Sequence, residues 1–313
     1  MSRVLVTGAS GFVGPHLIGA LENAGHTVYG TDRRGPDTAA HRACDLTDAP
    51  ATRQLVEDVR PDAVVHLASV SSVARSFEDP QDALHNNLLA ACNVFEALRW
   101  MAGVRVLVVG TAEQYGNVAE DALPVREQHP FEPASPYAVS KVAQEYLAQQ
   151  YARAYQLDVV LTRSFNHSGP GQSDQFVLAS FARQIAEAEV GTREPLLRVG
   201  NLDAERDFLD VRDVARAYVL LLERGASGAA YNVCSGRSHS LRRLLDIYLE
   251  AARVDVRVIP DPQRLRPADL AVLRGDATKL RAAGWEPQRE IQATLRDVLE
   301  DWRRRVHTRG TST

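Results

Sequence analysis

A glycine-rich segment near the N-terminus constrains the fold most strongly. Gly8, Gly11 and Gly14 stand three residues apart, directly after the apolar run Val4–Thr7 and before the helical pattern Pro15–Asn23. Glycines at this spacing permit a tight turn, close approach of the backbone to a pyrophosphate, and close packing of a helix on a strand. The N-terminus of that helix offers free N–H groups and the positive end of its dipole to an anion. The segment therefore predicts a dinucleotide-binding loop, with a glycine-rich turn that binds nothing as the alternative.

Strands and helices alternate through the first half of the chain. Each strand is a nearly continuous Val/Leu run, which is typical of strands buried on both faces of a parallel sheet. The predicted strands are Val4–Thr7, Thr27–Thr31, Ala63–Leu67, Val104–Val109 and Asp158–Leu161, and the predicted helices are Pro15–Asn23, Ala49–Val59, Asp82–Met101 and Pro136–Tyr155. The repeated β-α-β order predicts an α/β fold with a Rossmann-type, doubly wound parallel sheet.

The pattern changes after Arg163. A loop rich in Gly, Ser and Asn covers residues 166–174. The segments that follow are predicted as helices (Gln175–Ala188, Val211–Glu223, Leu241–Ala252, Ile291–Arg304) and short strands (Ala230–Val233, Val256–Ile259). We predict a dinucleotide-binding domain over residues 1–163, to which some later segments return, a smaller interleaved substrate domain mainly over 164–306, and a tail at 307–313.

Composition excludes several classes of function. The chain has 36 Lys and Arg against 40 Asp and Glu, a formal charge of −4, which gives no overall attraction for nucleic acid or an anionic membrane. Three scattered cysteines without CxxC spacing favour a reducing compartment over a disulfide framework. No apolar run approaches the ~20 residues of a spanning helix, no export signal is apparent, and no His/Cys/Asp cluster has metal spacing. We expect a cytoplasmic protein with no metal, and His66, in an apolar strand, as a core residue.

The second predicted strand ends at a carboxylate that bears on the choice of cofactor. Asp32 follows Gly14 by 18 residues (32 − 14 = 18). A carboxylate here can accept hydrogen bonds from the adenosine ribose of NAD and would repel the 2′-phosphate of NADP. Arg33 and Arg34 come next, and a guanidinium could instead hold that phosphate. The sequence therefore predicts NAD(P)H as cofactor and leaves the choice between NAD and NADP open.

A tyrosine and a lysine stand four residues apart in the predicted helix Pro136–Tyr155. Tyr137 and Lys141 share one face of that helix. A phenol with a pKa near ~10 needs a neighbouring cation to act as an acid–base group at neutral pH, and Lys141 supplies one. Taken alone, such a pair is a common surface feature. Downstream of a dinucleotide loop, it predicts an acid–base site in which Lys141 lowers the pKa of the phenol and can hold the nicotinamide ribose.

Two further polar residues follow the predicted strand Val104–Val109. Ligands of doubly wound sheets bind outside the carboxyl ends of the strands. Thr111 can offer its hydroxyl to a substrate oxygen there, and Glu113 can offer a carboxylate. A locally satisfied hydroxyl and a solvated acid are the alternatives.

These elements together resemble the extended short-chain dehydrogenase/reductase family, which acts on nucleotide sugars, and the resemblance covers the chain from Val4 to about Trp302. It implies a Rossmann domain with a smaller nucleotide-sugar domain, Tyr137 as the acid–base residue, Lys141 as its partner and Thr111 as the third catalytic member. It also implies a homodimer formed through two helices per subunit, here Asp82–Met101 and Tyr137–Tyr155.

The second half resembles the GDP-mannose branch of this family. The resemblance lies in RSFNHSGPGQ (163–172), GNLDAERDF (200–208), LRP (265–267) and RGD (274–276). The GFVG turn (11–14) is more similar to the ketoreductases of the branch than to the 4,6-dehydratases, which typically carry Gly-Gln-Asp-Gly. The resemblance thus implies NAD(P)H-dependent reduction of the C4 ketone of a GDP-linked 4-keto-6-deoxyhexose, GDP-4-keto-6-deoxy-D-mannose, to a GDP-6-deoxyhexose, most simply GDP-D-rhamnose.

Glu113 keeps the alternatives open. A glutamate at this position serves the dehydratases of the branch as a base, and ketoreductases can carry it too. A 4,6-dehydratase, another nucleotide-sugar epimerase or ketoreductase, and a non-catalytic NAD(P)-binding regulator on the same fold are the rival hypotheses.

The predicted binding residues fall into two groups. The cofactor group comprises the loop, strand-end and catalytic positions Gly8, Gly11, Phe12, Val13, Gly14, Asp32, Arg33, Asp45, Leu46, Leu67, Ala68, Tyr137 and Lys141, together with Asn87, which the resemblance places on the nicotinamide side. The substrate group comprises Asn166, which offers a donor and an acceptor, and Arg183, Arg206 and Arg266, whose guanidinium groups suit a diphosphate. Without the family resemblance, each arginine would be interpreted as half of a surface ion pair.

Overall fold

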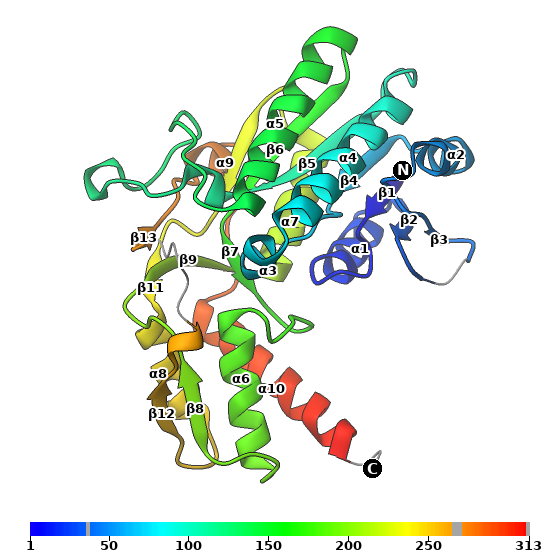
Figure 1. Ribbon diagram of the computed structural model, residues 1–313. Coiled ribbons are helices and arrows are strands. Elements are labelled where there is room, and N and C mark those ends of the chain that lie inside the picture. The colour runs from blue at the N-terminus through cyan, green and yellow to red at the C-terminus, as the bar shows by residue number, and fades with distance from the viewer. Residues whose placement is uncertain (36–37, 265–270, 311–313) are drawn as a thin grey trace.

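The computed structural model describes residues 1–35, 38–264 and 271–310, and the chain forms two lobes (Figure 1). The larger lobe is built on a seven-stranded sheet with the order β10-β6-β5-β4-β1-β2-β3, and every neighbouring pair in it is parallel. Its strands are β1 (Arg3–Thr7), β2 (Thr27–Asp32), β3 (His41–Ala43), β4 (Ala63–His66), β5 (Arg105–Thr111), β6 (Asp158–Ser164) and β10 (Ala230–Val233). The expected doubly wound parallel sheet is confirmed.

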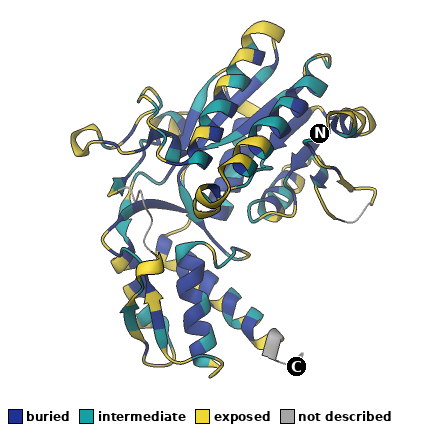
Figure 2. Cartoon of the chain, viewed as in Figure 1, coloured by how far each residue is buried: buried dark blue, intermediate teal, exposed yellow. Residues whose placement is uncertain are grey.

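Helices cover both faces of this sheet. One face packs against α1 (Gly14–Asn23) and α7 (Val211–Arg224), and the other packs against α2 (Ala49–Val59), α4 (Pro80–Leu98) and α5 (Pro136–Tyr155). In β1, Val4 and Val6 point to the first face while Leu5 points to the second. Because alternate side chains enter two separate cores, the strands read as uninterrupted apolar runs. Figure 2 shows the sheet buried beneath helices whose outer faces are exposed.

The smaller lobe combines short strands with three helices. A sheet of β11-β9-β13, with β7 also paired to β9, adjoins the larger lobe, and β8 pairs with β12 beyond it. The strands are β7 (Asn166–Ser168), β8 (Leu196–Val199), β9 (Glu205–Asp210), β11 (Ser238–Ser240), β12 (Arg257–Pro260) and β13 (Val272–Leu273), and the helices are α6 (Val177–Glu189), α8 (Leu241–Ala251) and α10 (Ile291–Gly310). Leu, Ile, Phe and Trp side chains from the three helices form its core.

The chain passes between the lobes several times. After β7–β9 it returns to the larger lobe as α7 and β10, crosses back for β11, α8 and β12, returns again as α9 (Thr278–Ala282), and ends in α10. Both lobes therefore depend on residues beyond position 164. The limits of the two domains at 163/164 and 306/307 stay a prediction.

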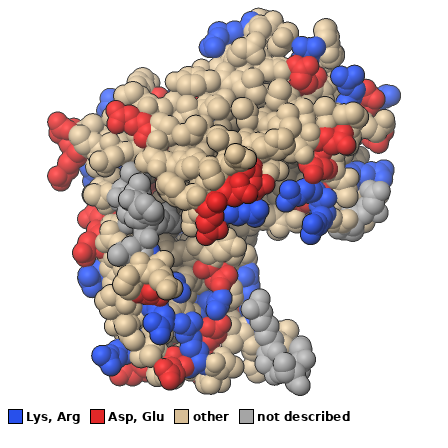
Figure 3. Space-filling view, in the orientation of Figure 1, with Lys and Arg blue, Asp and Glu red and all other residues tan. Residues whose placement is uncertain are grey.

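The surface carries charges of both signs, and the cysteines form no disulfide. Acidic and basic side chains are interspersed over the face seen in Figure 3. Cys44, Cys92 and Cys234 are free thiols. Across residues 1–35, 38–264 and 271–310, no helix has both the length and the apolar character needed to cross a bilayer, and no group of three His, Cys, Asp or Glu side chains could hold a metal ion.

Candidate active site

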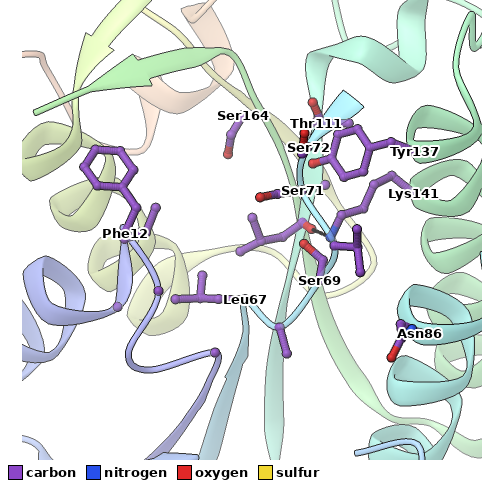
Figure 4. Close-up of a pocket in the computed structure, with 18 of the residues that line it drawn as sticks. Phe12, Leu67, Ser69, Ser71, Ser72, Asn86, Thr111, Tyr137, Lys141 and Ser164 are labelled. Atoms are coloured by element: carbon purple, nitrogen blue, oxygen red, sulfur yellow. Dashed lines mark hydrogen bonds between the residues drawn. The ribbon is translucent and has the colours of Figure 1, made fainter. Parts of the chain in front are cut away.

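A cavity of about 520 Å³ opens at the carboxyl ends of the central strands, between the two lobes (Figure 4). It lies where a doubly wound sheet binds its ligands. Most of the residues predicted from the sequence line it. These are Gly8, Gly11, Phe12, Val13, Gly14, Asp32, Arg33, Asp45, Leu46, Leu67, Ala68, Thr111, Glu113, Tyr137, Lys141 and Asn166.

The glycine loop has the close contacts that its spacing predicts. Gly8 has a φ of +70°, and a Cβ on it would lie 2.9 Å from the backbone N of Ala68 in the neighbouring loop. A Cβ on Gly14 would lie 2.0 Å from the carbonyl oxygen of Ala9. Helix α1 begins after Val13, whose side chain makes no capping hydrogen bond, and the N-terminus of the helix lies at the cavity, which Val13 and Gly14 line. This arrangement fits a dinucleotide pyrophosphate.

The two residues that bear on the choice between NAD and NADP, Asp32 and Arg33, both line one end of the cavity. Asp32 accepts a hydrogen bond from the backbone N–H of Ser10 (2.8 Å), and its carboxylate lies 3.5 Å from Nε2 of His41. Hydrogen bonds from Thr47 hold the pKa of Asp45 below its usual range, and the charge of Arg33 lowers it further. Because Asp32 and Arg33 both line the cavity, the residues fit the adenosine end of either NAD or NADP.

Thr111 and Tyr137 meet at the opposite end. Thr111 is the last residue of β5, and Tyr137 lies in the first turn of α5, whose N-cap is the Ser135 side chain. Both side chains line the cavity. Burial raises the pKa of Tyr137, the nearby Glu113 carboxylate raises it further, and the nearby Thr111 hydroxyl lowers it. The structure therefore brings Thr111, Tyr137 and Glu113 together.

Lys141 lies one turn further along α5 and is buried. Its Nζ donates to the carbonyl oxygen of Val109 (2.9 Å) and to Oε1 of Gln144 (3.0 Å). Burial lowers its pKa to about 7. The sequence predicted that Lys141 lowers the pKa of Tyr137, but the net shift of that phenol is upward, because burial and Glu113 dominate. The same lysine contributes, after burial, to lowering the pKa of His66 to about 3, and His66 is a core residue as expected.

We expect Lys141 to make the stability of the ligand-free protein depend on pH. Its pKa is about 7 in the folded protein and 10.5 in an ordinary exposed lysine. Between these values the unfolded chain binds a proton that the folded protein has released, so raising the pH favours folding. Urea denaturation should show wild type gaining stability relative to Lys141→Met as pH rises from 7 toward 10. A constant difference between the two proteins would contradict the buried, proton-releasing lysine.

Three predicted residues that the structure describes do not line the cavity. Asn87 lies behind it, where its Oδ1 accepts from the N–H of Val70 (2.7 Å) and its Nδ2 donates to Oγ of Ser140 (2.8 Å). Arg183 is paired with Asp174 and Glu187. Arg206 is buried in β9, where it donates to the Glu205 carbonyl oxygen (2.8 Å), and Arg266 lies outside the described residues. Their roles toward cofactor or substrate stay predictions.

Sequence reasoning missed several polar residues of the cavity. Ser164, at the end of β6, is the register partner of Thr111 and shares a hydrogen bond of 2.6 Å with the phenol of Tyr218. Figure 4 shows Ser164, Thr111 and Tyr137 around one part of the cavity, with Phe12 across from them. The position of Ser164 at a strand end was a usable signal. Tyr218 comes from α7, far along the chain, and nothing in its local pattern indicates a site.

His167 was also missed as a cavity residue. Its ring stacks on Phe12 with centroids 5.9 Å apart and an interplanar angle of 6°. Its Nδ1 is 3.0 Å from the carbonyl oxygen of Phe165, and burial lowers its pKa. A neutral ring that donates from Nδ1 leaves Nε2 as an acceptor. The loop after β6 therefore closes against the glycine loop on one side of the cavity.

Comparisons with known proteins agree with this geometry. The family model for GDP-mannose 4,6 dehydratase matches residues 5–298. A GDP-6-deoxy-D-mannose reductase of Pseudomonas aeruginosa is 42% identical over 97% of this chain and 98% of its own length. GDP-mannose 4,6 dehydratase 2 of Arabidopsis thaliana is 30% identical over 95% of this chain and 86% of its own length.

Solved structures are similar over nearly the whole chain. RMD from Pseudomonas aeruginosa complexed with NADPH has a TM-score of 0.87 and 40% identity, covering 97% of this chain and 100% of its own. A UDP-glucose 4-epimerase of Thermus thermophilus in complex with NAD has a TM-score of 0.86 and 32% identity, covering 96% and 99%. The chain therefore belongs to the GDP-mannose 4,6 dehydratase family of extended short-chain dehydrogenases/reductases and is an NAD(P)-dependent oxidoreductase.

Proposed function

We propose that the protein uses NAD(P)H to reduce the C4 ketone of GDP-4-keto-6-deoxy-D-mannose to a GDP-6-deoxyhexose, GDP-D-rhamnose being the expected product. The observation that carries this proposal is that Thr111 and Tyr137 line the same cavity as the Gly8–Gly14 loop (Figure 4). The reductase of Pseudomonas aeruginosa, 42% identical over nearly its full length, supports the choice of substrate.

In this proposal the glycine loop and the N-terminus of α1 hold the pyrophosphate, and Asp32 or Arg33 contacts the adenosine end. The bound nicotinamide supplies a hydride to the ketone carbon. Tyr137 gives its phenolic proton to the ketone oxygen, and the Thr111 hydroxyl hydrogen-bonds the same oxygen. The raised pKa of Tyr137 keeps the phenol protonated before reaction, and an alkoxide is a far stronger base than a phenolate, so the transfer stays favourable.

Lys141 serves two purposes in the proposal. Its ammonium group stabilises the phenolate that remains after proton transfer, and it can hold hydroxyl groups of the nicotinamide ribose. With a pKa of about 7, the charged form is accessible at neutral pH despite burial.

Glu113 favours a second candidate, a GDP-mannose 4,6-dehydratase. It lines the cavity and lies close enough to Tyr137 to raise the pKa of the phenol, as a base acting beside the reacting sugar would. In that reaction the cofactor is regenerated, so no net NAD(P)H is consumed.

One experiment separates these candidates. The purified protein is mixed with GDP-4-keto-6-deoxymannose and either NADH or NADPH, coenzyme absorbance is followed, and the sugar product is identified by NMR. The proposal predicts stoichiometric loss of reduced coenzyme and a reduced C4 centre, and the two coenzymes compared under the same conditions give the preference. A parallel incubation with GDP-mannose tests the second candidate. Conversion of GDP-mannose without net coenzyme consumption, together with no reduction of the ketosugar, would identify a dehydratase.

A homodimer through α4 and α5 stays a prediction. Large apolar side chains exposed on these two helices, Leu84, Val139 and Tyr146, support it. Sedimentation of the purified protein tests it, and a monomeric mass would exclude it.

A further inference from the structure

A buried polar network lies directly behind the Thr111–Tyr137 pair. Its members are Gln114 in the short 3₁₀ helix η1 (Ala112–Tyr115), Glu145 in α5 and Arg163 in β6. Gln114 is completely buried, and Glu145 and Arg163 are 2% and 5% exposed. None of the three lines the cavity, so none is available to contact a substrate or coenzyme there.

Gln114 reaches back to the peptide of the catalytic threonine. Its Oε1 accepts a hydrogen bond from the backbone N–H of Thr111 (2.9 Å), and its Nε2 donates to Oε2 of Glu145 (2.9 Å). Gly110 leaves space for the Gln114 side chain to bend back, because a Cβ at residue 110 would lie 2.5 Å from Oε1 of Gln114. The Thr111 N–H is buried and needs an acceptor, and Oε1 of Gln114 accepts its hydrogen bond.

Glu145 ties this contact to the catalytic helix. It lies one turn after Lys141 and two turns after Tyr137 on α5. Arg163 holds its two oxygens in a fork, with Nη2 at 2.6 Å from Oε1 and Nε at 3.1 Å from Oε2. Such bidentate, charge-assisted pairs fix geometry as well as contributing energy.

The guanidinium is itself anchored on its other side. Nη1 of Arg163 donates to the carbonyl oxygen of Glu127 (2.6 Å) and to the phenol of Tyr115 (2.9 Å). The Thr111 N–H and the polar side-chain groups of Gln114, Glu145 and Arg163 thus all have partners. A fully satisfied buried network of this kind holds one arrangement rather than several.

We propose that Gln114, held by the Glu145–Arg163 pair, is a positioning residue that fixes the Thr111 peptide and thereby sets the Thr111 hydroxyl against Tyr137. This inference rests on the proposed function. The hydroxyl is sensitive to the peptide because Oγ1 of Thr111 also accepts from the N–H of Glu113 (3.3 Å) within the same turn. A displacement of about 1 Å of a catalytic group can cost on the order of 100-fold in rate.

The matched variants are Gln114→Met and Gln149→Met, studied in the full-length protein with coenzyme and ketosugar. Methionine keeps the unbranched shape of glutamine and removes its polar groups. Gln149 donates to Oε1 of the same Glu145 (3.3 Å) and, within the part of the chain that the structure describes, makes no hydrogen bond to Thr111, so it controls for loss of a donor to that carboxylate. Gln114→Met should lower kcat by roughly 10- to 100-fold with KM and coenzyme Kd within about twofold. Gln149→Met should stay within about twofold of wild type.

A double-mutant cycle separates positioning from a general structural role. If Gln114 acts through Thr111, then Gln114→Met should cost less than about threefold in a Thr111→Ala background, because the group that it positions is already gone. An equal loss in both backgrounds, or an equal loss for Gln149→Met, would overturn the proposal. If Gln114→Met does not fold, Gln114→Leu takes its place in the same cycle.

Hydrogen–deuterium exchange makes the result independent of the assay. Without any substrate, the amide of Thr111 should exchange faster in Gln114→Met than in wild type or Gln149→Met, since its acceptor is lost. Unchanged exchange together with unchanged kcat would end the positioning proposal. A wild-type protein that does not reduce the ketosugar, but whose Thr111 amide responds as described, would overturn the proposed function and leave the contact established.

Discussion

Replacing Tyr137 with phenylalanine is expected to lower kcat by roughly 10²- to 10⁴-fold, the range that a positioned acid–base group contributes. The phenol is the proton donor in the proposed reaction, and its aromatic ring stays in place in the variant. Coenzyme affinity should change by less than about twofold, because the glycine loop and Asp32 or Arg33 are untouched. Ketosugar-dependent oxidation of the coenzyme measures the first quantity, and a fluorescence titration of the coenzyme measures the second.

Tyr231→Phe is the matched control. Tyr231 is also buried, and its phenol accepts a hydrogen bond from the N–H of Ala226 (3.0 Å), but it lies in β10 away from the lining of the cavity. The Tyr231→Phe variant loses a buried phenolic hydroxyl but keeps the proposed acid, so it should reduce the ketosugar at nearly the wild-type rate. A Tyr137→Phe protein with the rate of this control would show that another group protonates the substrate.

Replacing Gly14 with alanine is expected to weaken coenzyme binding and to lower the free energy of unfolding by roughly 1–3 kcal/mol or more. The added Cβ would lie 2.0 Å from the carbonyl oxygen of Ala9, and this neighbour is backbone that no side-chain rotation can move aside. Helix α1 must shift away from β1, which spoils the close approach of the loop to the pyrophosphate. Chemical denaturation and a coenzyme titration measure the two effects.

Gly19→Ala is a control in the same helix, for which the free energy of unfolding should rise and not fall. Apart from its two chain neighbours and the backbone of its own helix, nothing lies within 4 Å of the position that its Cβ would take. Alanine in a helix interior should raise the free energy of unfolding by about 0.4–1 kcal/mol and leave coenzyme binding unchanged. Destabilisation of similar size in both variants would refute the argument from close packing at Gly14.

The larger lobe was predictable because its signals are local. The Gly8–Gly14 loop and the apolar strands can each be identified from a few consecutive residues. Their β-α-β order then limits the possible topologies of the sheet. Strand β9, Glu205–Asp210, was not predicted, because its charged residues suggest a loop. Asp207 is nevertheless fully buried. It accepts from the backbone N–H groups of Ser235, Gly236 and Gly275, partners that no local pattern reveals.

The candidate site divides in the same way. Thr111, Tyr137 and Lys141 could be identified because a strand end and a four-residue helical spacing are visible in the sequence. The Gln114–Glu145–Arg163 network could not, since its contacts join residues 18 and 31 positions apart. Arg183 suited a diphosphate by residue type, yet the structure pairs it with Asp174 and Glu187.

Strand β10 is synthesised long after the strand that it pairs with, and this affects how the nascent chain folds. Strand β6 pairs with β10 along its outer edge, and residues 230–233 leave the ribosome only after β7, α6, β8 and β9 of the smaller lobe have been synthesised. Until then the nascent chain carries an apolar strand with an open row of backbone donors and acceptors, a template for pairing with other chains. A fragment that stopped before α7 and β10 would keep that edge permanently, so the coenzyme lobe is not a unit that can be excised by one cut.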